Sequence, residues 1–275
     1  MRWTPAGPSV QLTKTWMNCI LYRKCCIICT EVNRGIMKIH IGTDGQIAAE
    51  AAERYKKLLS EKPNAVLGFA TGSTPLLLYA ELIRLNKAGK LSFKKAVTFN
   101  LDEYVGLNET NEQSYRCFMN RNLFEQIDIP MRQTHVPQGR ECTDEQGAAY
   151  DNAIETAGGI DLQLLGIGNN GHIGFNEPGT PFGTMTHTVV LTPSTRLANA
   201  RFFRSVDDVP AEAVSMGIKT VMHARSIILI AEGEAKAQAI RDAFCGPVTE
   251  AVPASVLQLH PDVELYLDPE AAKLL

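Results

Sequence analysis

The chain has 275 residues, of which 45% are hydrophobic and 21% are charged. This is enough apolar material to bury a core in one large domain or two small ones. The formal net charge of -3 lacks the basic excess of a nucleic-acid binder, and no apolar run reaches the about 18 residues that a membrane span requires. We therefore expect a globular protein that binds neither nucleic acid nor membrane.

Residues 1–36 differ in composition from the rest of the chain. They contain four of the seven cysteines and both tryptophans. Their apolar stretch is interrupted by two basic residues and has no clear small-residue cleavage site after it, which disfavours a secretory signal. Cys25, Cys26 and Cys29 lack the second pair of ligands that a zinc site needs. We predict that residues 1–36 are a non-domain extension, disordered or translated upstream of a natural start at Met37.

From residue 38 onward, short apolar runs alternate with helical patterns. The runs at 65–70 and 226–231 are continuously apolar, which is typical of strands buried on both faces. Helices are predicted where apolar residues recur every three or four positions after a capping residue. In chain order we expect a strand at 38–41, a helix from 43 or 44, a strand at 65–70, a helix that begins at Pro75, a strand at 96–101, helices at 113–124 and from Thr143, a strand at 160–165, an exposed or edge strand at 186–191, a strand at 226–231, a helix at 233–244 and a strand at 263–267.

This alternation predicts an α/β fold. Strands separated by helices are typical of a three-layer, doubly wound, mostly parallel sheet of the Rossmann-like kind, with helices on both faces. No internal repeat or linker divides residues 37–275, so we expect them to form a single domain. The cysteines in this part, Cys117, Cys142 and Cys245, are scattered, as expected for reduced thiols in a cytoplasmic protein.

Polar segments follow four of the predicted strands. In sheets of this kind, ligands bind beyond the carboxyl ends of the strands, where the strand order reverses. The four segments are 71–74, 102–104, the loop 166–179 and 232–236. We therefore expect one site to be built from all four.

The first of these segments reads Thr-Gly-Ser-Thr and precedes a predicted helix. Free backbone N–H groups, hydroxyls and the positive end of a helix dipole favour a phosphate there. The segment matches neither a Walker loop nor a dinucleotide fingerprint, so a single sugar phosphate suits it better than a nucleotide. Lys236, Arg196 and Arg201 can supply further positive charge. The alternative is an ordinary helix-capping turn with solvated cations nearby.

The loop 166–179 contains five glycines, a histidine and a glutamate. Because glycine loses more backbone entropy on folding than any other residue, the loop must need unusual backbone angles or a close approach to something. Glu177 can orient or charge the imidazole of His172 for proton transfer. The alternative is a glycine-rich surface turn with an inert histidine.

Asp102 and Glu103 are adjacent, so in a strand they point to opposite sides and only one faces the site. A carboxylate in a partly dry pocket can have its pKa raised towards neutrality and act as a base for a carbon acid. A capping or salt-bridge role is the alternative for either residue. Two proton-transfer units beside a phosphate anchor suit an aldose-to-ketose proton shift on a phosphosugar. No His/Cys/Asp cluster has metal spacing, so we expect no metal and no cofactor.

Four segments together resemble glucosamine-6-phosphate deaminases, of the glucosamine/galactosamine-6-phosphate isomerase family. They are 67–75 (LGFATGSTP), 99–107 (FNLDEYVGL), 171–178 (GHIGFNEP) and 195–203 (TRLANARFF). The resemblance spans residue 37 to the C-terminus and does not extend to residues 1–36. It implies the conversion of glucosamine 6-phosphate and water to fructose 6-phosphate and ammonia.

The resemblance also implies a role for individual residues. The residue matching His172 is the base for ring opening, assisted by those matching Glu177 and Asn170. The residue matching Asp102 carries a proton from C2 to C1 through an enolamine, and the resulting imine is hydrolysed. The phosphate is implied to bind the backbone and hydroxyls of the turn, with two cations: Gly72, Ser73, Thr74, Arg201 and Lys236.

Two departures from the family pattern stand out. Some relatives have an aspartate where this chain has Asn170, so here Glu177 must supply the negative charge beside His172. Hexameric relatives activated by N-acetylglucosamine 6-phosphate have basic residues where this chain reads HTVV at 187–190, and they extend further at the C-terminus. We therefore expect a shorter, non-allosteric enzyme that is a monomer or a small homo-oligomer.

Two other functions are compatible with the same motifs. A 6-phosphogluconolactonase uses a glycine-histidine loop and a sugar phosphate but needs no carbon base, so Asp102 favours the deaminase. A non-catalytic sugar-phosphate sensor would retain the turn 71–74 without a reason to keep His172, Glu177 and Asp102 together.

Overall fold

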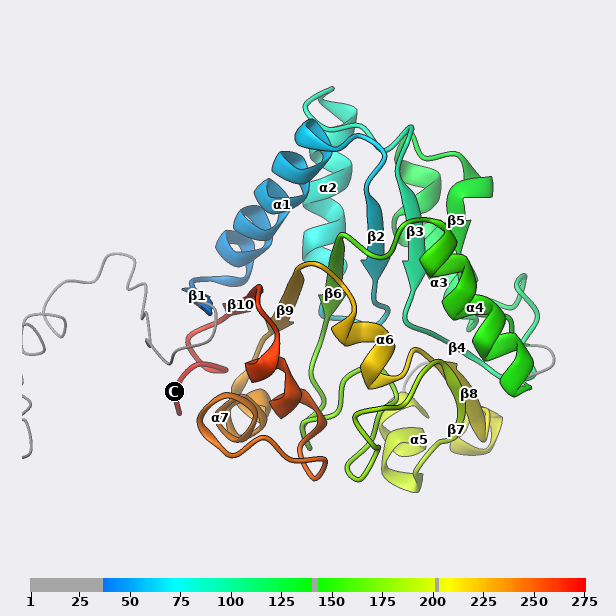
Figure 1. The fold of residues 1–275 in the computed structure, drawn as a ribbon, viewed down its shortest axis with the longest axis vertical. Helices are drawn as coiled ribbons and strands as arrows, with labels where there is room; N and C mark the ends of the chain where they lie inside the picture. The colour runs from blue at the N-terminus through cyan, green and yellow to red at the C-terminus, as the bar shows by residue number, and fades with distance from the viewer. Residues whose placement is uncertain (1–36, 140–142, 201–202) are drawn as a thin grey trace, which may run out of the picture.

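The computed structural model describes residues 37–139, 143–200 and 203–275 (Figure 1). The predicted extension 1–36 and the predicted phosphate ligand Arg201 lie outside the described residues.

A parallel sheet of seven strands runs through the centre of the molecule. Each strand pairs in parallel with its neighbours, as the sequence predicted. From one edge to the other, the strands are β1 (Lys38–Ile41), β10 (Val263–Leu267), β9 (Ile227–Ala231), β6 (Leu162–Leu165), β2 (Val66–Phe69), β3 (Val97–Asn100) and β5 (Thr134–His135).

Helices cover both faces of this sheet. On one face, Phe69 of β2 packs against Tyr55 and Tyr79 from two different helices. On the other face, Phe99 of β3 contacts Tyr150 of a third helix. The helices are α1 (Asp44–Glu61), α2 (Leu76–Lys87), α3 (Tyr115–Asn122), α4 (Asp144–Thr156), α5 (Pro193–Asn199), α6 (Ile218–Met222) and α7 (Ala237–Cys245). This arrangement confirms the predicted α/β architecture.

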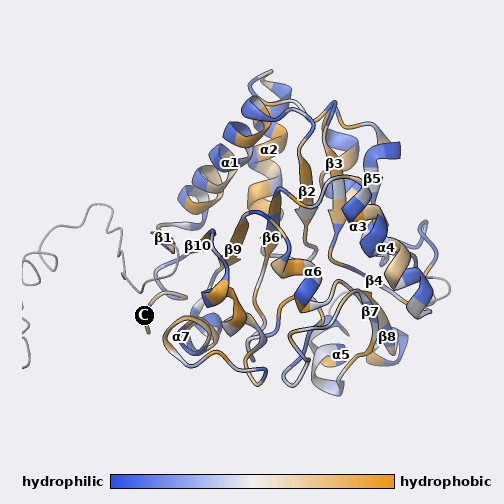
Figure 2. Cartoon of the chain, in the orientation of Figure 1, coloured by the Kyte–Doolittle hydropathy of each residue, from blue (hydrophilic) through white to orange (hydrophobic). Residues whose placement is uncertain are grey.

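The central strands are apolar because both of their faces are covered. All four residues of β2, all four of β6 and all five of β9 are buried. Figure 2 shows these strands as mainly hydrophobic and the outer sides of the surrounding helices as mainly hydrophilic. Each fully buried Leu or Ile stabilises the fold by roughly 1.5–3 kcal/mol. The carboxyl ends of the strands are therefore fixed by a rigid core.

A second, antiparallel sheet lies beyond the carboxyl ends of the first. It consists of β4 (Asp102–Tyr104), β8 (Glu212–Ser215) and β7 (His187–Val190), in that order. The sequence treated 102–104 as the end of the third strand, but the chain leaves the main sheet at Leu101 and starts a new one. Its partner β8 comes far later in the sequence, so no local pattern reveals the pairing. The predicted exposed or edge strand at 186–191 is confirmed as β7.

The prediction omitted β5, β8, α5 and α6, and it also differs from the structure at helix ends. Pro75 is the N-cap of α2 rather than its first residue, and α3 begins two residues later than expected. The predicted helix at 233–244 begins as a 3-10 turn, Glu234–Lys236, and becomes α7 only at Ala237. The remaining 3-10 segments are Phe124–Gln126, Met131–Gln133, Val206–Asp208 and Pro253–Leu259. Among the described residues, no helix is both long and apolar enough to cross a membrane.

The strand order reverses between β2 and β6. From β2 the chain continues to β3 and β5 on one side, whereas from β6 it continues to β9 and β10 on the other. The loops that follow β2 and β6 therefore diverge and leave a crevice between them. These loops are the Thr-Gly-Ser-Thr turn and the glycine-rich loop.

Candidate active site

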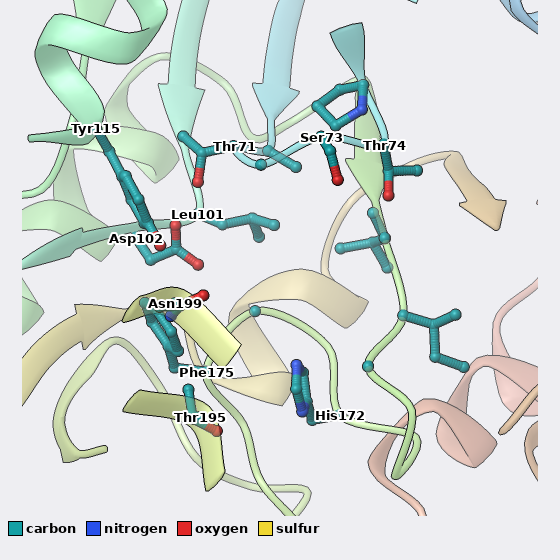
Figure 3. Close-up of a pocket in the computed structure, with 18 of the residues that line it drawn as sticks. Thr71, Ser73, Thr74, Leu101, Asp102, Tyr115, His172, Phe175, Thr195 and Asn199 are labelled. Atoms are coloured by element: carbon teal, nitrogen blue, oxygen red, sulfur yellow. The ribbon is translucent and has the colours of Figure 1, made fainter. Parts of the chain in front are cut away.

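A cavity of about 820 Å³ opens at this reversal point (Figure 3). Three of its walls come from the turn after β2, the loop after β6 and the segment after β9. The fourth is β4 of the second sheet, which the sequence had placed at a strand end. Seven predicted site residues line this one cavity: Gly72, Ser73, Thr74, Asp102, Asn170, His172 and Lys236.

The turn after β2 forms one wall of the cavity. Gly72 has a φ of 100°, a left-handed conformation that other residues adopt with strain. The hydroxyls of Ser73 and Thr74 follow it, just before the N-terminus of α2. Lys236 reaches the same cavity from the end of the 3-10 turn after β9. Hydroxyls, a helix N-terminus and a cation together suit a phosphate group.

Asp102 is almost entirely buried, with 6% of its surface exposed. It is fixed in place by β4, where it pairs with Ser215 of β8. Burial and the neighbouring charge of Glu103 raise its pKa to about 8, although the Thr71 hydroxyl opposes the shift. A carboxyl group with a pKa near neutrality can both accept a proton and return it.

Glu103 points to the opposite side of β4, as predicted for adjacent strand residues. Its carboxylate accepts hydrogen bonds from the backbone N–H groups of Tyr104 (2.8 Å), Tyr115 (2.8 Å) and Arg116 (3.0 Å). Two of these N–H groups belong to the first turn of α3. Glu103 is therefore a structural acceptor at the start of that helix, and only Asp102 faces the cavity.

His172 and Glu177 form a contact within the glycine-rich loop. His172 Nδ1 lies 3.5 Å from Glu177 Oε2, and Asn170 Nδ2 donates to the same oxygen at 2.7 Å. Burial alone would raise the pKa of Glu177, but the hydrogen bonds from His172, Thr195 and Asn170 outweigh it and lower the pKa to about 2. Glu177 is thus an anion in contact with the imidazole. It does not line the cavity itself but lies behind His172.

A glycine allows the His172 ring to occupy its position. A Cβ atom added to Gly168 would lie 2.2 Å from the nearest ring atom of His172, which is closer than side chains approach. The ring therefore packs against the bare backbone of its own loop. This close approach explains one of the five glycines that the sequence singled out.

Other cavity residues were not predicted as site residues. Tyr104 and Tyr115 form an aromatic wall with Phe175 and Phe203. The remaining additions with polar side chains are Thr71, Glu112, Gln113, Asn169, Thr195, Asn199 and Glu232. Sequence reasoning did not single out the aromatic wall because its members come from separate elements, and no motif spacing connects them. Their place in the quoted segments was the available signal: Tyr104 and Phe175 lie in segments expected to build the site, and Thr195, Asn199 and Phe203 lie in TRLANARFF.

The described part of the chain contains no group of three or more His, Cys, Asp or Glu side chains placed to hold a metal ion.

Comparison with known proteins identifies the family. A sequence model for glucosamine-6-phosphate isomerases and 6-phosphogluconolactonases matches residues 44–265. The chain belongs to this family. A glucosamine-6-phosphate deaminase from Thermoanaerobacter pseudethanolicus is 50% identical over 231 residues, covering 84% of this chain and 91% of that protein. Another, from Lachnoclostridium phytofermentans, is 54% identical over 223 residues, covering 79% and 92%.

Solved structures of the family show the same fold. A structure described as a monomeric glucosamine-6-phosphate deaminase superposes with a TM-score of 0.84 at 44% identity, covering 87% of this chain and all of that one. The 6-phosphogluconolactonase from Trypanosoma cruzi superposes with a TM-score of 0.70 at 20% identity, covering 87% and 97%. The second likeness concerns the fold alone.

Proposed function

We propose that this chain is an amino-sugar phosphate deaminase that converts glucosamine 6-phosphate and water to fructose 6-phosphate and ammonia. One observation carries the proposal: Asp102, His172 and the Ser73 turn open onto a single cavity. A phosphate anchored at the turn would leave the sugar between an imidazole and a lone buried carboxyl group. The similarity to deaminases at about half of all aligned positions supports the same reaction.

Ring opening is the first task of the site. In the proposed mechanism His172 takes the proton from the anomeric hydroxyl and returns it to the ring oxygen, which gives the open-chain aldehyde. The anionic Glu177 stabilises the imidazolium that forms between these two transfers. Asn170 holds the second contact to the same carboxylate oxygen and so fixes its position. Because Asn170 carries no charge, it is Glu177 that supplies the negative charge in contact with His172.

Isomerisation and deamination are the second task. Asp102 in its ionised form removes the proton from C2 of the aldehyde, which gives an enolamine, and returns it to C1. The C2 imine that results adds water and releases ammonia, leaving the C2 ketone of fructose 6-phosphate. A pKa of about 8 suits a base that must take and give back the same proton near neutral pH.

Substrate binding is assigned to the turn and its cations. Gly72, Ser73, Thr74 and Lys236 would hold the phosphate, with Arg201 as a further cation outside the described residues. The aromatic wall of Tyr104, Tyr115 and Phe203 would cover the sugar and exclude water. We assign no metal and no cofactor to the reaction, since its steps are proton transfers and hydrolysis.

A direct assay tests this proposal. The purified chain is incubated with glucosamine 6-phosphate, with and without a chelator, and ammonia and fructose 6-phosphate are measured. We expect the two products in equal amounts and no loss of activity with the chelator. Hydrolysis of 6-phosphogluconolactone without ammonia release would favour the lactonase instead. Binding of glucosamine 6-phosphate without turnover would favour a sensor.

We further propose that residues 37–275 form one catalytic domain in the cytoplasm and act as a monomer or small homo-oligomer. The family match at 44–265 and the full coverage of the monomeric deaminase structure support this. Residues 1–36 are proposed to be dispensable. A variant that starts at Met37 should keep the activity and the melting temperature of the full chain.

A further inference from the structure

The carboxylate of Glu177 has partners on both oxygens. Oε2 accepts from Asn170 and contacts His172, which are neighbours in its own loop. Oε1 accepts from the hydroxyl of Thr195, with 2.5 Å between the oxygens. Thr195 belongs to α5, which is the only element outside the loop that binds this carboxylate in the described hydrogen bonds.

The direction of the Thr195 hydrogen bond is determined by chemistry. An ionised carboxylate can only accept, so the single hydroxyl proton of Thr195 must be donated to Glu177. The lone pairs of Thr195 Oγ1 then remain free to accept, and Thr192 Oγ1 lies 3.0 Å away. Thr192 in turn accepts from the backbone N–H of Thr195 at 3.2 Å. The two hydroxyls form a short chain that ends on the catalytic loop.

Helix α5 does not need the Thr195 hydroxyl for its own stability. Its N-cap is Thr192, which already accepts the free N–H of the first turn. The Thr195 side chain is nevertheless buried, with 9% of its surface exposed. Thr195 lines the cavity, as does Asn199 one turn further along the same helix. The helix therefore contacts both the substrate cavity and the partner of the imidazole.

We propose that Thr195 is a positioning residue that holds Glu177 against His172 and couples the placement of α5 to ring opening. This inference rests on the proposed deaminase function. Loss of the hydroxyl leaves one carboxylate oxygen without its donor, so the carboxylate is free to rotate away from Nδ1. A hydrogen bond to a charged group is worth enough to change a rate by about 10- to 100-fold.

Four variants separate this role from a general loss of packing. Thr195→Val removes the hydroxyl at nearly constant volume, and Thr195→Ser keeps it. Thr180→Val is the matched control, because the Thr180 hydroxyl donates to the backbone carbonyl of Glu177 at 2.8 Å and not to its carboxylate. Thr195→Ala is a second hydroxyl-free variant for the case that valine unfolds the chain.

For T195V we expect kcat to fall about 10- to 100-fold, with KM changed less than about threefold, because Thr195 acts on the proton-transfer unit. T195S should recover most of the rate, and T180V should behave as the parent chain.

Two results would overturn the proposal. One is a T195V enzyme with the parent kcat and KM, and the other is a T195S enzyme as impaired as T195V, which would point to packing of the side chain rather than to its hydroxyl. Failure of the parent chain itself to release ammonia would instead refute the deaminase function. The two failures are therefore distinguishable in one set of assays.

Discussion

At the scale of single residues, two adjacent acids have opposite tasks. Asp102 and Glu103 share one short strand and similar burial, yet one faces a cavity and the other faces three backbone N–H groups. Burial raises the pKa of both carboxyl groups, but only Asp102 faces the cavity, where we propose its chemical role. Its neighbour is fully engaged in holding the start of a helix. The difference follows from the alternation of side chains along a strand.

We expect the buried Asp102 to lower the stability of the folded chain near neutral pH. Between an ordinary aspartate pKa and its folded pKa of about 8, the folded state binds a proton that the unfolded state does not. Stability contributed by this group therefore falls as pH rises through that interval. We expect Asp102→Asn to abolish deamination while substrate binding persists, and to stabilise the fold at pH 7 by on the order of a few kcal/mol.

Denaturant unfolding of both chains between pH 4 and pH 8 measures this effect. The stability difference should be small at pH 4 and should grow towards pH 8. A stability difference between the two chains that is the same at pH 4 and at pH 8 would show that ionisation of Asp102 does not destabilise the fold. Deamination near the parent rate in the variant would show that it is not the carbon base.

Glu232 is an acid in the same cavity as the phosphate residues. Burial and the negative charges of Asp44 and Asp268 raise its pKa to about 7. Glu232 is therefore neutral below pH 7 and negative above it, where it repels a substrate phosphate that is already a dianion. We expect KM for glucosamine 6-phosphate to rise between pH 6 and pH 8, and Glu232→Gln to lower KM at pH 8 by about three- to tenfold.

Glu234→Gln is the matched control for this prediction. Glu234 lies two residues away, is exposed and pairs with Lys273 at the surface rather than lining the cavity. Its substitution should leave the pH dependence of KM unchanged. A parent KM that is constant from pH 6 to pH 8 would contradict the prediction for Glu232.

At the scale of elements, helix α3 depends on an acceptor outside itself. Its first turn donates two N–H groups to Glu103, in addition to the N-cap hydrogen bond at Ser114. The same helix carries Tyr115, which forms part of the cavity wall. Glu103 on β4 thus holds the start of α3, the helix that carries Tyr115, beside the second sheet.

Glu103→Ala should therefore destabilise the chain by at least about 2 kcal/mol, because it leaves buried N–H groups unpaired and opens a cavity. The effect is opposite in sign to that of substituting the adjacent Asp102. Urea unfolding of the two variants at pH 7 provides the comparison. Equal destabilisation by both substitutions would show that Asp102 and Glu103 contribute to stability in the same way.

At the scale of the whole molecule, the site depends on two sheets. The parallel sheet brings the Thr-Gly-Ser-Thr turn and the glycine-rich loop together where its strand order reverses. The antiparallel sheet then places Asp102 opposite them, and its β7 edge leads into α5. A small aromatic and aliphatic core of Tyr104, Phe175, Leu191, Val209 and Ala213 supports this second unit.

We expect simple saturation kinetics from this molecule. Strand β7 reads HTVV, with Val190 exposed, so it carries neither Lys nor Arg. A phosphorylated effector therefore lacks the cations that would bind it there. Velocity should depend hyperbolically on glucosamine 6-phosphate, and N-acetylglucosamine 6-phosphate should not activate. Sigmoidal kinetics relieved by that sugar, or a hexamer by analytical ultracentrifugation, would contradict this.

Much of the molecule could be predicted from local sequence patterns. Buried strands such as 226–231 are recognisable because both faces must be apolar, and helix starts such as Thr143 because a free N–H needs an acceptor. Strand ends and polar segments then indicated where a site should form. The resemblance to deaminases added the reaction, which composition and spacing could not supply.

By itself, the sequence determined most of the alternating strands and helices, the Thr-Gly-Ser-Thr turn before α2 and the presence of a His–Glu pair, because each depends on residues close together in the chain. It did not predict β5, β8, α5 or α6. Only the tertiary structure decided that β4 pairs with β8, that Glu103 rather than Asp102 is held by backbone N–H groups, and that Thr195 contacts Glu177. These contacts join different elements of the fold. Contacts between elements are set by tertiary packing, so no local pattern records them.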